Sequence, residues 1–448
     1  MIEAKNELVT FTAVQAAQLI RDHKLSALEL TQACLEQIEA AEPEVQAFAF
    51  LDPEHAQAQA RALDDQRGHG RPLGPLHGVP VGVKDIIDTE DMPTENGTVL
   101  HAGRRPRADA AVVSRLRAAG AVILGKTVTT ELAVYAPNKT RNPHDPEQTP
   151  GGSSSGSAAA VAARMLPLAL GTQTNGSVIR PAAYCGVYGF KPGHGLISRA
   201  GILRQSPPLD TVGVMANSLP DLALLAEVLM GYDPADPALR PSARPRLLEV
   251  AMEPPPVVPD LGFVRTPVWD QAEDETRAAF EELVAALGER VAAADLPPAF
   301  DHAVSLHGTI MEADLARSFA KEYERGRDRL SARLCQMIER GQRCVAVDYN
   351  RALDAIPSLV AALEPLFERY DALLTPATTG PAPHGLGSTG SPVFCTIWTL
   401  CGMPAVSLPL LQAGNGLPLG VQLVGRKGDD ARLLRTARWL IETLRAEV

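Results

Sequence analysis

Three segments of the sequence carry residue types that could together form a nucleophilic site. Lys84 ends the apolar segment HGVPVGVKD, where a charged ammonium is costly unless it is paired or neutral. The segment GGSSSGS at 151–157 concentrates hydroxyl groups and glycines beside a helix start. In TNGS, Ser177 directly follows a glycine, so backbone N–H groups can converge on one point there. A serine becomes a nucleophile when a base takes its proton, and a lysine of lowered pKa can be that base.

Each segment also has an ordinary structural interpretation. A lysine at a strand end is usually a surface residue, a Gly/Ser run is usually a flexible loop, and a serine after Asn-Gly is usually a turn residue. What favours chemistry is the joint appearance of the three segments within surrounding sequence that matches one family.

Short strands and helices alternate around these segments. Val79, Val81 and Val83 alternate with smaller residues and predict a strand that ends at Lys84. AVVSRLRAAG predicts a helix and AVILGKT a short buried strand, and AAAVAARM predicts a helix directly after GGSSSGS. At the N-terminus, Thr12 with Gln15 and Ser26 with Glu29 have the spacing of helix capping boxes. This alternation predicts a layered α/β architecture.

Composition excludes several classes of protein. The chain is 45% hydrophobic and 21% charged, which is typical of a folded protein, and its net charge of −11 argues against a nucleic-acid binder. No apolar run approaches the length of a membrane span, and the first residues lack the pattern of a signal peptide. The six cysteines form neither a disulfide framework nor a metal-binding pattern. We therefore expect a soluble, cytoplasmic protein that uses no metal and no cofactor and binds neither nucleic acid nor membrane.

Several long segments together resemble the amidase-signature family of serine hydrolases. PLHGVPVGVKD resembles the family's lysine segment, TPGGSSSGSAAAVAA its Gly/Ser-rich segment, and GTQTNGSVIRPAAYCGVYGFKP its nucleophile segment. The tail TLCGMPAVSLPLLQAGNGLPLGVQLVG also matches, in the same order along the chain. The resemblance implies one large α/β domain over 1–448, with a central mixed, twisted β-sheet covered by helices on both faces. Within it we expect a helical lead-in (1–65), a signature core (about 70–230), a variable helical region (about 232–370) and a strand/helix return (371–448).

The resemblance also implies roles for individual residues. Ser177 would be the nucleophile, Ser153 the serine that relays its proton after an unusual cis peptide at Gly152, and Lys84 the base. Ser154 would support this relay. The oxyanion hole would consist of the backbone N–H groups of Thr174, Asn175, Gly176 and Ser177.

The sequence departs from the family pattern close to these residues. Ser155 stands where a glycine is usual, Gln173 replaces an acid, and Asn175 replaces a glycine. The usual arginine two positions after the nucleophile is Ile179, and Arg180 follows it. Arg180 could meet a substrate carboxylate, but we expect a structural ion pair. The departures leave the three catalytic positions in place and affect the expected substrate contacts.

The resemblance implies an amide substrate and water, with carbamates (urethanes) and esters as possible extensions. We expect the pocket walls to come from Tyr135, the stretch from Ile202 to Gln205, and the segment from Phe394 to Trp398. These residues are more apolar than charged, which favours a neutral or aryl amide or a carbamate. A homodimer is also expected.

Three other functions compete with a free-standing amidase. The family includes glutaminase subunits of tRNA-dependent amidotransferases, which act within a protein complex. A catalytically silent binding or scaffold protein on the same fold is a second alternative. The third is an α/β-hydrolase, because Gly152–Gly156 fits GxSxG with Ser154 as nucleophile and His302 or His384 as its partner.

Overall fold

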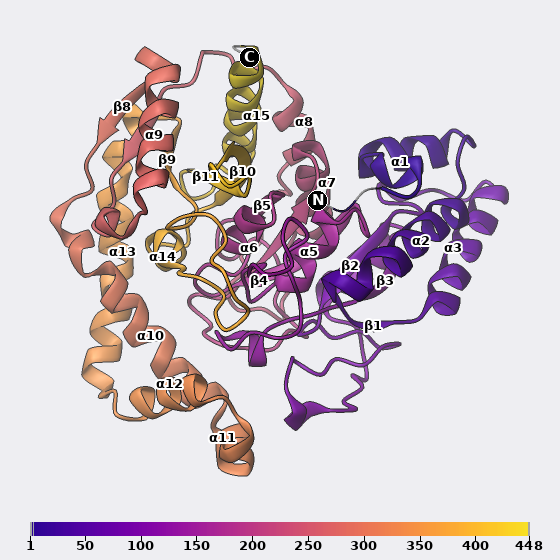
Figure 1. Cartoon of the computed structure of the whole chain (residues 1–448), viewed down its shortest axis with the longest axis horizontal. Helices are drawn as coiled ribbons and strands as arrows, with labels where there is room; N and C mark the ends of the chain where they lie inside the picture. The colour runs from indigo at the N-terminus through magenta and orange to yellow at the C-terminus, as the bar shows by residue number, and fades with distance from the viewer. Residues whose placement is uncertain (1, 3, 447–448) are drawn as a thin grey trace.

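The strands form one mixed sheet, in which parallel and antiparallel neighbours alternate in blocks (Figure 1). This computed structural model describes residue 2 and residues 4–446, so residues 1, 3, 447 and 448 of the expected domain lie outside the described part. The order across the sheet is β1-β3-β2-β4-β6-β5-β10-β11-β9-β7-β8. The strands are β1 (Phe48–Leu51), β2 (Pro80–Lys84), β3 (Val122–Thr127), β4 (Leu168–Gln173), β5 (Tyr188–Lys191), β6 (Thr211–Ala216), β7 (Leu261–Val264), β8 (Val291–Ala294), β9 (Ala372–Pro376), β10 (Ala405–Gln412) and β11 (Pro418–Val424).

The predicted mixed sheet is confirmed. β2 runs parallel to both of its neighbours, β3 and β4, whereas β6 pairs antiparallel with β4 and β5. At the other end of the sheet, β7 runs parallel to β8 and β9. Lys84 therefore lies at the carboxyl end of a strand with a partner on each side.

Helices cover both faces of the sheet, as expected. They are α1 (Ala13–Arg21), α2 (Ala27–Val45), α3 (Pro53–Gly68), α4 (Ala111–Ala118), α5 (Ser155–Ala162), α6 (Ile179–Tyr184), α7 (Leu219–Leu229), α8 (Leu247–Met252), α9 (Asp274–Leu287), α10 (Ala303–Ser318), α11 (Ala320–Gly326), α12 (Ala332–Gln342), α13 (Ala346–Arg369), α14 (Val393–Leu400) and α15 (Asp430–Ala446). Successive side chains of a strand point to opposite faces. Thus Leu168 and Leu170 of β4 pack in the core with α7 and α15, whereas Ala169 packs in the core with α2 and α5. Both expected capping boxes, at Thr12 and Ser26, are present.

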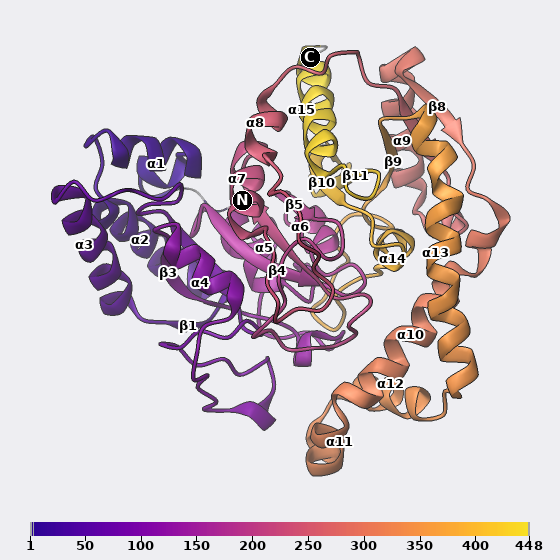
Figure 2. The same ribbon diagram turned by 180° about the vertical axis from the view of Figure 1, so that it is seen from behind.

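The segment between β8 and β9 is largely helical, and its helices α10, α11, α12 and α13 lie on the opposite side of the molecule from α1, α2 and α3 (Figure 1, Figure 2). Ile310 and Met311 of α10 share a hydrophobic core with Cys395 and Trp398 of α14. This packing joins α10 to α14, although the two helices are far apart in the sequence. Within the described residues, no helix is long and apolar enough to cross a membrane.

The small residues of α5 allow this helix to lie directly against β3. Every residue of α5 is buried. At Gly156, a Cβ atom would come within 2.3 Å of the carbonyl oxygen of Ala47 and 2.4 Å of the amide nitrogen of Val128. Gly156 also donates its own N–H to the carbonyl of Val128. Because α5 begins directly after Ser153 and Ser154, this close contact fixes the position of both serines.

We predict that Gly156→Ala destabilises the fold. The added methyl group meets backbone atoms that cannot rotate away, and overpacking of this kind costs about 1–3 kcal/mol. Equilibrium urea denaturation measures the change in the free energy of unfolding. Gly308→Ala in α10 is the matched control, because no atom lies within 4 Å of the added Cβ there and alanine favours the helix. Equal stability of the two variants would contradict the prediction.

Candidate active site

Lys84 is fully buried at the end of β2 and contacts two hydroxyl groups. Its Nζ lies 2.7 Å from Ser153 Oγ and 2.9 Å from Thr172 Oγ1 of the adjacent strand β4. Burial lowers the pKa of Lys84 well below its ordinary value, since water no longer stabilises the ammonium, while the charge of Asp210 raises it and that of Arg180 lowers it. The arrangement places a lysine that is readily neutral beside a serine hydroxyl.

Ser153 follows a cis peptide bond, as the resemblance implied. The Gly152–Ser153 bond is cis, and Ser153 is buried immediately before α5. Gly152 is closely surrounded, because a Cβ atom there would lie 2.8 Å from a methyl carbon of Thr389. The N–H of Ser154 donates to the carbonyl of Ser177 at 3.4 Å, so the loop that carries Ser177 lies next to this segment.

Ser154 bonds the backbone of β4. Its Oγ accepts from the N–H of Thr172 at 3.2 Å and lies 3.3 Å from the carbonyl oxygen of the same residue. Ser154 therefore bonds the backbone of Thr172, and the side chain of Thr172 accepts from Lys84. Neither His302 nor His384 forms a hydrogen bond with Ser154 in the described part of the chain, so the α/β-hydrolase alternative has no base there.

Ser177 lies in the loop between β4 and α6, and Gln173 organises this loop. The Oε1 of Gln173 accepts from the N–H groups of Val178 (2.8 Å) and Ile179 (3.0 Å), and its Nε2 donates to Thr399 Oγ1 at 3.0 Å. A carboxylate could accept the same two N–H groups but could not donate to Thr399. The amide at this position is therefore compatible with an ordered loop.

Two carbonyl groups of this loop accept hydrogen bonds from helices in distant parts of the sequence. The carbonyl of Thr174 accepts from His307 Nε2 of α10 at 2.9 Å, and that of Asn175 accepts from Thr399 Oγ1 of α14 at 2.5 Å. The Asn175 side chain donates to the Tyr135 hydroxyl and accepts from Thr396. The backbone N–H groups of the loop are left without an acceptor among the described residues; they belong to Thr174, Asn175, Gly176 and Ser177.

Arg180 does not form the expected ion pair. It is fully buried, and no carboxylate of the described residues pairs with it. Its guanidinium instead donates to the carbonyl of Gly152 at 2.7 Å and 3.2 Å and to that of Gly390 at 2.6 Å. Burial lowers the pKa of this group. Arg180 thus holds the carbonyl of the cis peptide, and it does so without a negative partner.

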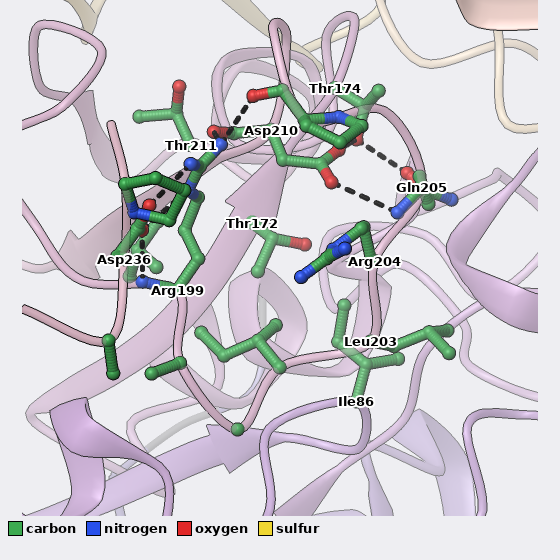
Figure 3. Close-up of a pocket in the computed structure, with 17 residues that line it drawn as sticks. Ile86, Thr172, Thr174, Arg199, Leu203, Arg204, Gln205, Asp210, Thr211 and Asp236 are labelled. Carbon is green, nitrogen blue, oxygen red and sulfur yellow. Dashed lines mark hydrogen bonds and ion pairs between the residues drawn. The ribbon is translucent and has the colours of Figure 1, made fainter. Parts of the chain in front are cut away.

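Two cavities flank the Ser177 loop. One, of about 190 Å³, is lined by Thr172 and Thr174 and by Ile202 and Gln205, which were predicted as pocket residues (Figure 3). The other, of about 280 Å³, is lined by Tyr135, as predicted, and by Asn175. Further apolar walls of the second cavity come from Met311, Met337, Pro392 and Val393.

Trp398 lines neither cavity. It is fully buried and packs in the core between α10 and α14. Its segment VFCTIWTL is almost wholly apolar, so the sequence gave no means of telling a pocket wall from a core residue. Within the described residues, no group of three or more His, Cys, Asp or Glu side chains could hold a metal ion.

The chain is similar to known proteins over nearly its whole length. A family model described as Amidase matches residues 29–434. A glutamyl-tRNA(Gln) amidotransferase subunit of Chloroflexus aurantiacus is 36% identical over 474 residues, which cover 95% of each chain. The native peptide amidase from Stenotrophomonas maltophilia has a TM-score of 0.84 at 29% identity, over 98% of both chains. A structure from a vestigial protein complex that reveals the evolutionary origins of an s-triazine catabolic enzyme has a TM-score of 0.90 at 29% identity and covers 97% of this chain and 98% of that one.

We predict that the stability cost of Lys84 depends on pH. The folded-state pKa lies below the ordinary value, so between the two the unfolded chain binds the extra proton and stability rises with pH. Lys84→Met removes this dependence. The free energy of unfolding of Lys84→Met minus that of the unsubstituted protein should therefore be larger at pH 7 than at pH 10, which means that the substitution stabilises more at pH 7. Urea denaturation at both pH values measures this difference, and an equal or opposite difference would show that Lys84 is not destabilised by burial.

Proposed function

Since the chain belongs to the amidase family, whose model matches residues 29–434, we propose that it hydrolyses amide C–N bonds with Ser177 as nucleophile, Ser153 as proton relay and Lys84 as base. The observation that carries this proposal is the buried contact of 2.7 Å between Lys84 Nζ and Ser153 Oγ. The serine that Lys84 contacts also follows the cis peptide and lies beside the Ser177 loop.

The reaction begins with a double proton transfer. Neutral Lys84 takes the proton of Ser153 while Ser153 takes that of Ser177, whose Oγ forms a bond to the substrate carbonyl carbon. When the C–N bond breaks, the proton returns from Lys84 through Ser153 to the leaving nitrogen, and an acyl-enzyme remains. A water molecule then attacks the acyl carbon, gives its proton to the same relay, and releases the acid as Ser177 regains its proton.

The four N–H groups of the loop that have no acceptor in the described part of the chain are the donors that we propose as the oxyanion hole. Negative charge develops on the carbonyl oxygen during the attack of Ser177, and a preorganised donor contributes about 3–4 kcal/mol to its stabilisation. Hydrogen bonds hold the loop carbonyls of Thr174 and Asn175 away from this point, so that the peptide N–H groups are available to it.

The cavity beside Asn175 supports a neutral, apolar or aryl group on the substrate. Tyr135 and two methionines, Met311 and Met337, form the apolar part of its walls, and charged groups of Glu312, Arg333 and Arg340 also line it. Methionine side chains adapt to irregular apolar groups and contact aromatic rings favourably. A carbamate presents the same carbonyl to Ser177, and its product acid would lose carbon dioxide, so urethanes are included in the proposal.

A glutaminase subunit is the second candidate. The observation that favours it is the 36% identity to the glutamyl-tRNA(Gln) amidotransferase subunit of Chloroflexus aurantiacus over 95% of each chain. Such a role would require a protein partner in addition to the small-molecule substrate and water. Turnover of simple amides by the purified chain alone would count against it, whereas glutamine hydrolysis only in a complex would establish it.

We predict that Ser177→Ala abolishes amide hydrolysis and that Lys84→Ala lowers kcat at neutral pH by about 100-fold or more. Circular dichroism should show that both variants fold. Labelling by a serine-directed fluorophosphonate, located by peptide mass spectrometry, should modify Ser177 in the unsubstituted protein. A protein that is neither labelled nor active would support a silent binding role, and near-full activity of Lys84→Ala would exclude Lys84 as the base.

A substrate panel tests the proposed specificity. Anilides, primary amides, aryl carbamates and amides that bear a carboxylate should be compared by kcat/KM. We expect neutral aryl amides or carbamates to be preferred, because Tyr135, Met311 and Met337 offer an apolar surface beside Asn175. A strong preference for the carboxylate-bearing amides would contradict this expectation.

A further inference from the structure

The sheet places Asp210 directly against the Ser177 loop. β4 and β6 pair antiparallel with Gln173 opposite Thr211, which are the last residue of β4 and the first of β6. The next position beyond this pair therefore brings Thr174, the first residue of the loop, opposite Asp210. The register of two buried strands thus fixes this juxtaposition.

The carboxylate of Asp210 makes contacts with both of its oxygens. Its Oδ1 lies 2.6 Å from Thr174 Oγ1, and its Oδ2 accepts from the N–H groups of Gln205 (2.9 Å) and Ser206 (3.0 Å). The Thr174 hydroxyl is also 2.5 Å from Gln205 Oε1, and Gln205 Nε2 donates to the carbonyl of Leu132. The Thr174 hydroxyl, which has one proton to donate, therefore lies between two acceptors that are themselves fixed.

Asp210 also lines the same cavity as Thr172, which accepts a hydrogen bond from Lys84. Thr172, Thr174 and Asp210 line the same cavity, and Figure 3 shows their side chains around it. Thr172 Oγ1 accepts a hydrogen bond from Lys84 Nζ at 2.9 Å. Thr172 and Thr174 are alternate residues, so their side chains point to the same face. Thr172 connects this cavity to Lys84, and Thr174 connects it to the Ser177 loop.

We propose that Asp210 is a positioning residue of the reaction. It holds the Ser177 loop through Thr174, and its negative charge acts on Lys84. This inference rests on the proposed function, because it assigns Asp210 a task only if Lys84 is the base. Asp210 touches neither the reacting serines nor a cofactor, so it acts through Thr174 and through its field at Lys84.

The charge of Asp210 raises the pKa of Lys84. Burial raises the pKa of Asp210 to about 6, so the carboxylate is ionised above this pH. Its charge opposes the effect of burial at Lys84 and keeps the lysine a stronger base than it would otherwise be. Other titratable or charged groups lie around Asp210 or around the residues that hold it: Lys84, Arg180, Arg199, Arg204, Asp236, His307 and Asp314.

Asp210→Asn tests the proposal, because it keeps the shape and removes the charge. Without the carboxylate, the ammonium of Lys84 loses its proton at lower pH, so the acid-side midpoint of kcat/KM should move down by about half a pH unit. The weaker base and the looser loop should lower kcat by about tenfold. Thr174→Val, which keeps the charge but removes the hydroxyl, should lower kcat without this displacement of the midpoint.

Asp314→Asn is the matched control. Asp314 is another buried carboxylate nearby, which accepts from Ser206 Oγ at 2.7 Å and Tyr349 at 3.0 Å but does not contact Thr174. This variant should keep the acid-side midpoint of the unsubstituted protein. If Asp210→Asn and Asp314→Asn have the same midpoint in folded proteins, the inference is wrong. Fluorophosphonate labelling of Ser177 separates the two failures, because labelling with an unmoved midpoint overturns the role of Asp210 alone, whereas absent labelling overturns the proposed function.

Discussion

The site depends on the burial of Lys84, which has no ion-pair partner among the residues that the structure describes. The Nζ of Lys84 meets two hydroxyl groups, those of Ser153 and Thr172, and no water-exposed surface. Hydroxyl groups can accept from an ammonium or donate to an amine, so they accommodate both protonation states, whereas a contacting carboxylate would hold the lysine in its charged form. The burial of this strand end by a complete sheet with helices on both faces is therefore a condition for the chemistry as well as for the fold.

The loop that carries Ser177 is also unusual, because its buried backbone N–H groups have no acceptor among the described residues. Buried N–H groups are normally paired, and unpaired ones are costly. Here the opposite ends of the peptide groups are held by His307 and Thr399, which belong to α10 and α14. The C-terminal third of the chain thus holds the carbonyl ends of these peptide groups, and under the proposed function their N–H ends would meet the developing oxyanion.

Much of this site could be predicted from the sequence, and the rest depends on contacts between distant segments. The alternating valines indicated that Lys84 ends a buried strand, and the Gly/Ser run together with the family resemblance identified Ser153. No local pattern marks Asp210, because its place opposite Thr174 follows from the register of β4 and β6. Trp398 was misplaced for a similar reason, since the packing of α14 against α10 decides which of its residues are buried in the core.

The departures at Gln173 and Arg180 both bear on the charges around Lys84. Gln173 accepts the N–H groups at the start of α6 as an acid could, but it adds no negative charge to the site. Arg180 holds the Gly152 carbonyl, and its own charge lowers the pKa of Lys84. Asp210 is the nearby group whose charge acts in the other direction, and its carboxylate is anchored by the N–H groups of Gln205 and Ser206. The basicity of the lysine is therefore set by a balance between burial, one buried guanidinium and one carboxylate, and the neutral residue at 173 leaves that balance to Asp210.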